Sequence, residues 1–397
     1  MAIATPERLL HDVAEGRRLT PAEAVRLYHE AELLELGKAA QRARFRHNPE
    51  RRVTYLIDRN INYTNVCITD CQFCAFYRPN DKHPEAYTLS RAQIAEKIDE
   101  LLDAGGTRIL MQGGHHPGLP LAWYEDLLRW LRATYPEIEI NSFSPSEIDH
   151  IASVDGSTME NVLVRLRAAG MAGLPGGGGE MLVDAIRQKV SPKKQNAAGW
   201  LEAMRIAQRL GLTTSSTMVI GFGETIEQRI EHLQKLRDLQ DESRAAHGNG
   251  FGAFIAWTLQ VENTPLGRSK SRDTYGASGT DYLRLVAMAR LFLDNISHVQ
   301  ASWPTQGVKL AQVALEFGCD DFGSTMMEEN VVSSAGTSLR NVAEIAIQRQ
   351  VAAAGYTPAQ RNTRYEVLRV VDRVPSPAAP RRPVASSPAS RVSYHQA

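Results

Sequence analysis

Three of the chain's four cysteines lie within eight residues, in the segment NVCITDCQFCAF. Cys67, Cys71 and Cys74 follow the spacing C-x3-C-x2-C. A structural zinc usually needs a fourth protein ligand, and the nearest candidate, His83, stands at no recognised zinc spacing. A disulfide would leave one thiol over. Three thiolates on a [4Fe–4S] cluster would leave one iron free to bind a small molecule. The spacing therefore favours a cluster, with zinc or buried core thiols as the alternatives.

Two glycines and two histidines follow a strand-like run in LMQGGHHPGL. Gly113 and Gly114 would suit a tight turn, or a close approach of the backbone to a bound molecule. His115 and His116 could be structural, as a loop histidine often is. Alternatively, one of them could bind a carboxylate or move a proton near neutral pH.

Other candidate residues stand at the ends of later strand-like runs. Glu180 ends the glycine-rich run LPGGGGE, which could otherwise be a flexible linker. Its carboxylate could accept hydrogen bonds from ribose hydroxyls. Ser144, in FSPSE, could cap a helix together with Glu147 three residues later, or contact a ligand. Asp321, in CDDFGSTMMEEN, could cap a helix or act as a base.

Alternating strand and helix patterns would position these residues. The predicted strands are 53–64, 107–114, 137–144, 213–221, 251–260 and 298–303, with short ones near 171–180 and 319–324. The predicted helices are 90–104, 121–134, 157–169, 197–210, 225–240, 281–295, 305–317 and 337–354. This repetition predicts an α/β fold, a barrel of the TIM type with eight parallel strands. The loops that follow the strands gather at one end of such a barrel, so the candidate residues should meet there.

The remaining features limit the class of protein. Lys plus Arg and Asp plus Glu both number 45, so charge gives no reason to expect nucleic acid or an anionic membrane as partner. No apolar stretch approaches a membrane span, and few, clustered cysteines indicate the cytoplasm. Residues 1–50 are predicted to form a helical extension, in which Thr20 caps a helix that begins at Pro21. Residues 51–372 would form the barrel domain, and the Pro/Ser/Ala-rich residues 373–397 a disordered tail.

The cysteine spacing, with Phe73 directly before the last cysteine, resembles the signature of the radical S-adenosylmethionine (SAM) enzymes. The resemblance implies a [4Fe–4S] cluster on Cys67, Cys71 and Cys74, with SAM bound to the open iron. It also implies that an electron from the cluster cleaves SAM to methionine and a 5′-deoxyadenosyl radical. The positions that contact SAM in that family correspond here to Phe73, Gly113, Gly114, Glu180 and the backbone around Ile220.

Longer segments resemble one family within this group. RNINYTNVCITDCQFCAFYR, QGGHHPGL, NSFSPSEI, FIAWTLQVENT and DDFGSTMMEENVVSSAG are similar to cyclic dehypoxanthinyl futalosine synthases of the futalosine route to menaquinone. The resemblance implies that the deoxyadenosyl radical takes the C4′ hydrogen from the ribose of dehypoxanthine futalosine, and that the carbon radical adds to the benzoate ring. Restoring aromaticity then releases an electron and a proton, and His115, His116 or Asp321 would be the base.

The resemblance leaves the substrate contacts open. Ser144 would contact the substrate, and Arg78 could bind its carboxylate, although a solvated surface position is the alternative for Arg78. The partners implied are the small-molecule substrate and an electron donor such as flavodoxin or ferredoxin. The chain departs from the family at LPGGGGE, where members often carry Ala before the glutamate.

Three other functions stay open. A related radical SAM enzyme, aminofutalosine synthase, would add the deoxyadenosyl radical to an enolpyruvyl-benzoate. The pair His115-His116 favours the cyclase, because the related families keep one histidine there. An iron–sulfur electron carrier would need no open iron and no glycine-rich motifs on several loops. A zinc-binding structural protein is the remaining alternative.

Overall fold

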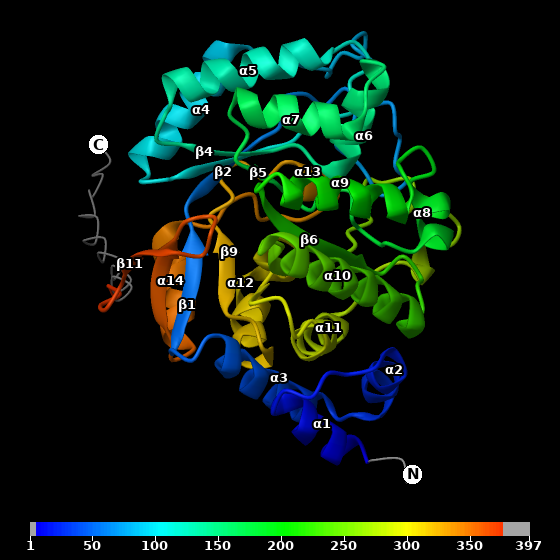
Figure 1. Cartoon of the computed structure of the whole chain (residues 1–397), viewed down its shortest axis with the longest axis vertical. Coiled ribbons are helices and arrows are strands. Elements are labelled where there is room, and N and C mark those ends of the chain that lie inside the picture. The colour runs from blue at the N-terminus through cyan, green and yellow to red at the C-terminus, as the bar shows by residue number, and fades with distance from the viewer. Residues whose placement is uncertain (1–4, 376–397) are drawn as a thin grey trace, which may run out of the picture.

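The computed structural model describes residues 5–375 and shows parallel strands surrounded by helices (Figure 1). The barrel strands are β1 (Arg52–Leu56), β2 (Asp58–Ile61), β3 (Arg108–Met111), β4 (Glu139–Ser142), β5 (Gly173–Leu174), β6 (Thr213–Ile220), β7 (Phe251–Thr258), β8 (His298–Gln300) and β9 (Asp321–Ser324). Their order is β1-β9-β8-β7-β6-β5-β4-β3-β2, and all neighbours in this series are parallel. The predicted α/β class and parallel sheet are confirmed.

The sheet closes because β1 and β2 are successive parts of one extended segment, interrupted only at Ile57. The first part pairs with β9 and the second with β3. Beyond β9 the chain continues along β2, where the Asn60 N–H donates to the Met327 carbonyl at 2.9 Å. The two ends of the strand series are therefore one strand, and the sheet forms the predicted barrel.

Alternation along the strands separates the barrel interior from the layer beneath the helices. On β3, Ile109 and Met111 are fully buried, whereas Arg108 and Leu110 line the central cavity. On β6, every second residue from Thr213 to Val219 lines the cavity in the same way, and Thr214 lines it as well at the start of the strand. The interior consequently carries polar as well as apolar side chains, and the main apolar core lies between the strands and the helices.

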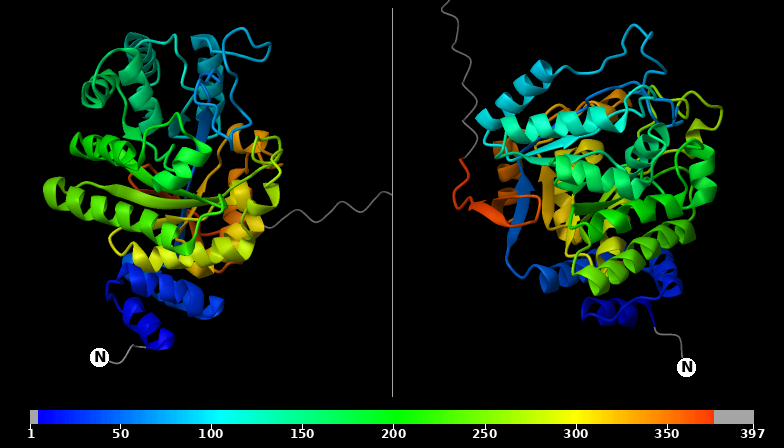
Figure 2. Two further views of the ribbon diagram at one scale, coloured as in Figure 1. Left: turned by 90° about the vertical axis from the view of Figure 1, so that its right-hand side faces the viewer. Right: turned by 45° about the horizontal axis from the view of Figure 1, so that its top comes forward.

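The helices that cover the barrel mostly follow the predicted pattern (Figure 2). They are α4 (Arg91–Asp103), α5 (Leu121–Thr134), α6 (Pro145–Val154), α7 (Met159–Ala169), α8 (Asp184–Val190), α9 (Ala197–Arg209), α10 (Ile226–His247), α11 (Gly279–Phe292), α12 (Trp303–Ala314), the short α13 (Val331–Ser334) and α14 (Glu344–Ala353). Capping boxes fix the starts of three, at Ser90, Thr225 and Ser278. The predicted helices did not include α6, α8 or α13. The last two are too short to show a clear apolar period, and for α6 only a possible cap, Ser144 with Glu147, was recognised. The last helix begins at Glu344 rather than at residue 337.

Three helices form the N-terminal segment at the lower end of the barrel in Figure 1, namely α1 (Pro6–Ala14), α2 (Pro21–Glu30) and α3 (Leu33–His47). Thr20 caps α2 in a capping box with Glu23, and Pro21 is the first helical residue, as predicted. Arg18 ties this segment to the barrel helices through Asp294, at 2.8 Å. The segment therefore braces the end of the barrel opposite the cysteines.

A C-terminal hairpin, which the sequence did not predict, closes that same end. Strand β10 (Thr357–Arg361) pairs in parallel with β1, and β11 (Val367–Val370) pairs with β10 antiparallel. In the turn between them, Tyr365 stacks on His298 with ring centroids 3.8 Å apart. Most of the predicted tail, residues 376–397, lies outside the described residues. None of the helices in residues 5–375 combines the length and the apolar character that crossing a membrane requires.

Candidate active site

Cys67, Cys71 and Cys74, hereafter the cluster cysteines, lie in the long loop between β2 and α4. All three line one cavity of about 880 Å³. The Thr69 hydroxyl oxygen lies 2.9 Å from Cys67 Sγ and 3.7 Å from Cys71 Sγ, so these two sulfurs are close together. The Cys74 N–H donates to the Cys71 carbonyl at 3.0 Å, which fixes the third cysteine beside the second.

Arg78 holds this loop in place. The Cys67 N–H donates to the Arg78 carbonyl at 2.9 Å, and the Arg78 guanidinium donates to the Tyr77 carbonyl at 2.9 Å. The same guanidinium pairs with Glu85 at 2.5 Å. Arg78 does not line the main cavity. Its position thus argues against the predicted contact with the substrate carboxylate, because its charge is used to brace the loop.

The two glycines after β3 allow the next loop to pack against the cluster cysteines. A Cβ on Gly114 would overlap the Val66 carbonyl oxygen and stand 2.9 Å from Cys67 Cβ. A Cβ on Gly113 would come within 2.5 Å of the Tyr63 ring. The structure gives these glycines a packing reason, in addition to any contact with SAM.

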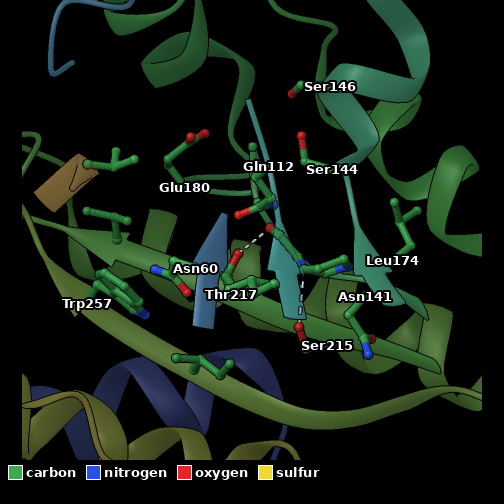
Figure 3. A pocket seen from close by; sticks show the side chains of 18 of the residues that line it. Asn60, Gln112, Asn141, Ser144, Ser146, Leu174, Glu180, Ser215, Thr217 and Trp257 are labelled. Atoms are coloured by element: carbon green, nitrogen blue, oxygen red, sulfur yellow. Dashed lines mark hydrogen bonds between the residues drawn. The ribbon is translucent and has the colours of Figure 1, made fainter. Parts of the chain in front are cut away.

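The glycine-rich run 176–179 is a packed element rather than a linker. A Cβ on Gly177 would stand 2.6 Å from Gln112 Nε2, and Gly178 combines a φ of +78° with a position directly against Ser146 Oγ. The run therefore lies against the ends of β3 and β4, and places Glu180 on the cavity wall (Figure 3). Only glycine gives the backbone this close approach.

Glu180 lines the cavity, and one of its carboxylate oxygens, Oε2, accepts no hydrogen bond from any described residue although Arg187 Nη1 lies 4.0 Å from it. Oε1 accepts from Lys194 Nζ at 2.8 Å, whereas Oε2 is buried and has no hydrogen-bond partner among the described residues. Burial by itself would raise the pKa of Glu180, but the charges of Lys194 and Arg187 outweigh burial and hold that pKa below its usual value. The Lys194 ammonium also lies 5.3 Å from the centre of the Phe73 ring. A carboxylate with an unused oxygen is suited to a ligand that brings hydroxyl or ammonium donors.

The Glu147 side chain, on α6, connects the segments that follow β2, β3 and β4. Its carboxylate accepts from the Tyr63 hydroxyl and the Gly113 N–H, both at 2.9 Å, and from the Ser144 hydroxyl at 2.7 Å. Ser144 also caps α6 by accepting from the Glu147 N–H at 3.3 Å, which is one of the two roles that the sequence left open for it. Burial raises the pKa of Glu147 to about 7. Sequence reasoning took Glu147 only as a cap partner and missed this second role.

The two adjacent histidines point in different directions. His115 lines the cavity and stacks on His150, with ring centroids 5.0 Å apart. Burial, with Lys194 and His150 nearby, holds the pKa of His115 well below its usual value, so its ring is neutral near neutral pH. His116 accepts from the Gly118 N–H through Nδ1 at 3.0 Å and pairs with Asp81 through Nε2 at 2.9 Å. His116 does not line the cavity, which argues against its predicted role as a base.

Two further predicted residues lie behind the cavity wall. Asp321 is fully buried and pairs with Arg361 at 2.6 Å, while the Thr54 hydroxyl donates to it at 2.6 Å. A carboxylate held in this way is structural, which argues against Asp321 as the base. Ile220 is also fully buried, and its carbonyl accepts from the Leu259 N–H at 2.9 Å. Neither residue lines the cavity, although Val219, next to Ile220, does.

Comparisons with known proteins agree with this geometry. The radical SAM superfamily model matches residues 61–236, and the model of the CofH/MqnC C-terminal region matches residues 248–374. A cyclic dehypoxanthine futalosine synthase of Halalkalibacterium halodurans is 44% identical over 92% of this chain and 95% of that protein. One from Streptomyces coelicolor is 42% identical over 92% of this chain and 89% of that protein. The chain belongs to this family of radical SAM enzymes.

Relatives with other names are less similar. The aminodeoxyfutalosine synthase of Thermus thermophilus is 34% identical over 91% of this chain and 95% of that protein. Among solved structures, methylornithine synthase has a TM-score of 0.67 at 21% identity, and covers 88% of this chain and 97% of its own. The hydrogenase maturase HydG has a TM-score of 0.70 at 16% identity, and covers 91% of this chain and 77% of its own. These two share the barrel fold.

The family uses a [4Fe–4S] cluster and SAM, and the residues of this chain fit both. Burial raises the pKa of Cys71 to about 11, with Lys194 acting in the opposite direction, and bound iron would favour the thiolate that burial alone disfavours. No three His, Cys, Asp or Glu side chains within residues 5–375 converge as they would on a single metal ion. The cluster cysteines suit a cluster, whose iron atoms are spread over a larger volume. The free oxygen of Glu180 and the ring of Phe73 lie on the same wall, where SAM would bind.

Proposed function

We propose that this chain converts dehypoxanthine futalosine into cyclic dehypoxanthinyl futalosine in the futalosine route to menaquinone. The observation that carries the proposal is the 42–44% identity, over nine-tenths of the chain, to relatives named for that reaction. The cavity supports it, because the cluster cysteines, Glu180 and the neutral ring of His115 all line this one cavity. It is large enough for SAM and a second small molecule together.

When bound, the cluster and SAM would supply the 5′-deoxyadenosyl radical that takes the C4′ hydrogen of the ribose, and an acceptor for the electron released later. The protein positions the reactants and excludes water. Glu180 would accept hydrogen bonds from SAM through its free oxygen, and Phe73 would form the wall beside it. Glu147 would keep the loop of Gly113 against the cluster cysteines through the Gly113 N–H.

The substrate's carbon radical would then add to the benzoate ring, and rearomatisation would release a proton. His115 would accept this proton, because its ring is neutral, faces the cavity and makes no hydrogen bond with any described residue. His116 would have a structural role, because its ring accepts from the Gly118 N–H and so stabilises that turn. Ser144 would position the Glu147 carboxyl and not contact the substrate, since its hydroxyl already donates to Glu147.

The reaction also needs a one-electron donor. We propose an acidic carrier such as flavodoxin or ferredoxin, and a cytoplasmic location in which the four cysteines remain reduced.

The test is anaerobic incubation of the reconstituted protein with dehypoxanthine futalosine, SAM and a reductant. The expected result is a product lighter than the substrate by two hydrogens, with an equal amount of free 5′-deoxyadenosine. An aminodeoxyfutalosine synthase would instead consume an enolpyruvyl-benzoate and retain the deoxyadenosyl group in its product. A product of that kind, or no cyclised product from dehypoxanthine futalosine, would contradict the proposal.

A further inference from the structure

The main cavity extends from the cluster cysteines down the barrel axis, below the place where SAM would bind. Leu110 and Arg108 on β3, Asn141 on β4 and Ser215 on β6 line this lower part, hereafter the lower chamber (Figure 3 shows Asn141 and Ser215). The turn that carries Tyr365 closes it from beneath, through the stack on His298. The lower chamber thus has strand residues as its walls and this turn as its floor, and a second molecule would lie in it under SAM.

The described residues that line the whole cavity include the following cationic side chains: Arg108, Lys194, Arg244, Arg361 and Arg364. Lys194 lies at the cysteine end and is paired with Glu180. Arg361 donates from Nε and Nη2 to Asp321, at 2.6 and 3.0 Å. Arg244 and Arg364 are exposed. Arg108 is therefore the candidate within the lower chamber for binding an anion.

One hydrogen bond outside the cavity orients the Arg108 side chain, and its other guanidinium donors have no partner among the described residues. Its Nη2 donates to Asp58, a fully buried carboxylate that does not line the cavity. Asp58 is itself fixed, since it accepts from the Met326 N–H at 3.2 Å. Nη1 of Arg108 makes no hydrogen bond with any described residue, and Nε is buried without a partner. An arginine oriented by a structural carboxylate, with donors left over, suits a ligand carboxylate.

We propose that Arg108 binds the carboxylate of the substrate's benzoate ring, an inference that rests on the proposed function. The substrate would then stand upright in the barrel, with the carboxylate in the lower chamber and the ribose directed up towards the cluster cysteines. Apolar side chains are placed to contact the ring between these ends, because Leu110, Leu174 and Ile255 line the cavity and the indole of Trp257 projects into it (Figure 3). The carboxylate would thereby set which ring carbon lies beside C4′.

The experiment compares dehypoxanthine futalosine with its carboxamide analogue, on the reconstituted wild-type enzyme and on variants. The quantity measured is the ratio of kcat/KM for the two compounds, together with the calorimetric affinity for each. Removing a buried ionic contact should cost about 30-fold or more, so the wild type should prefer the carboxylate by that factor. Failure of the wild type to cyclise dehypoxanthine futalosine would count against the proposed function itself, whatever Arg108 does.

The main variant combines Arg108→Gln with Asp58→Asn, so that no unpaired charge remains buried. It should accept both compounds within about threefold of each other. Arg364→Gln, the matched change of an exposed cation in the same cavity, should keep the wild-type ratio. Iron content and circular dichroism check that each variant is intact. If the double variant does not fold, Arg108→Lys replaces it, with the ratio expected to fall about tenfold because lysine lacks the planar fork.

Three results would overturn the proposal. They are a wild type that does not distinguish the two compounds, an Arg108 variant that keeps the wild-type preference, and a loss of preference in Arg364→Gln instead.

Discussion

Replacing Glu147 by glutamine tests whether this buried carboxyl carries a proton near neutral pH. Burial raises the pKa of Glu147 from 4.5 to about 7. A carboxyl whose pKa is raised binds its proton more tightly in the folded chain than in the unfolded chain. Its contribution to stability is therefore complete below about pH 4.5 and is lost as the pH rises towards 7.

The size of the effect follows from the shift. About 2.5 pKa units at 1.36 kcal/mol each give a loss of about 3 kcal/mol, of which roughly 2 to 3 kcal/mol falls between about pH 5 and pH 8. Glutamine is neutral at every pH and has nearly the same shape. Its amide oxygen can accept from the Tyr63 hydroxyl and the Gly113 N–H, and its amide N–H can donate to Ser144, whose hydroxyl can turn to accept.

The assay is the free energy of unfolding in urea, measured for both proteins at about pH 5 and pH 8. Glu147→Gln should gain roughly 2 to 3 kcal/mol relative to the wild type on going from the lower to the higher pH. Ser144→Ala keeps the carboxyl and removes a hydrogen bond that lowers the pKa of Glu147, so it should still lose stability between these two pH values, as the wild type does. A difference between Glu147→Gln and the wild type that is constant with pH would refute the reasoning.

Three further predictions concern the loops at the cysteine end. Alanine at any one of the cluster cysteines should lower the iron and sulfide content after reconstitution to near zero, whereas Cys319→Ala, in the core, should keep the cluster at a cost of about 1 kcal/mol. Gly114→Ala should reduce cluster content and lower the unfolding temperature, because its Cβ would overlap the Val66 carbonyl oxygen, and normal cluster content would contradict this. His115→Gln should lower the yield of cyclised product per 5′-deoxyadenosine by about 100-fold, since the general base is lost. His116→Gln should keep that ratio and lower the stability of the protein instead. If His116→Gln lowers the ratio and His115→Gln does not, His116 is the base and His115 is structural.

The barrel and the cluster cysteines could be predicted because both depend on local sequence. Alternating strand and helix patterns show which residues form each element, and the C-x3-C-x2-C spacing places three thiols on one loop. The hairpin of β10 and β11 was missed because β10, on which β11 pairs, is held by β1, about 300 residues earlier in the chain. Non-local pairing of this kind leaves little trace in the sequence of either strand.

The sequence by itself determined the cofactor chemistry and the family, because residue type and spacing within one loop indicate the first and short segments along the chain indicate the second. Only the tertiary structure decided which candidate side chains face the cavity. His115 faces it and His116 does not, Asp321 is paired behind the wall, and Arg108 opens into the lower chamber. The physical reason is that a side chain's direction depends on strand register and on how the barrel closes, and these are set by contacts between segments far apart in the chain.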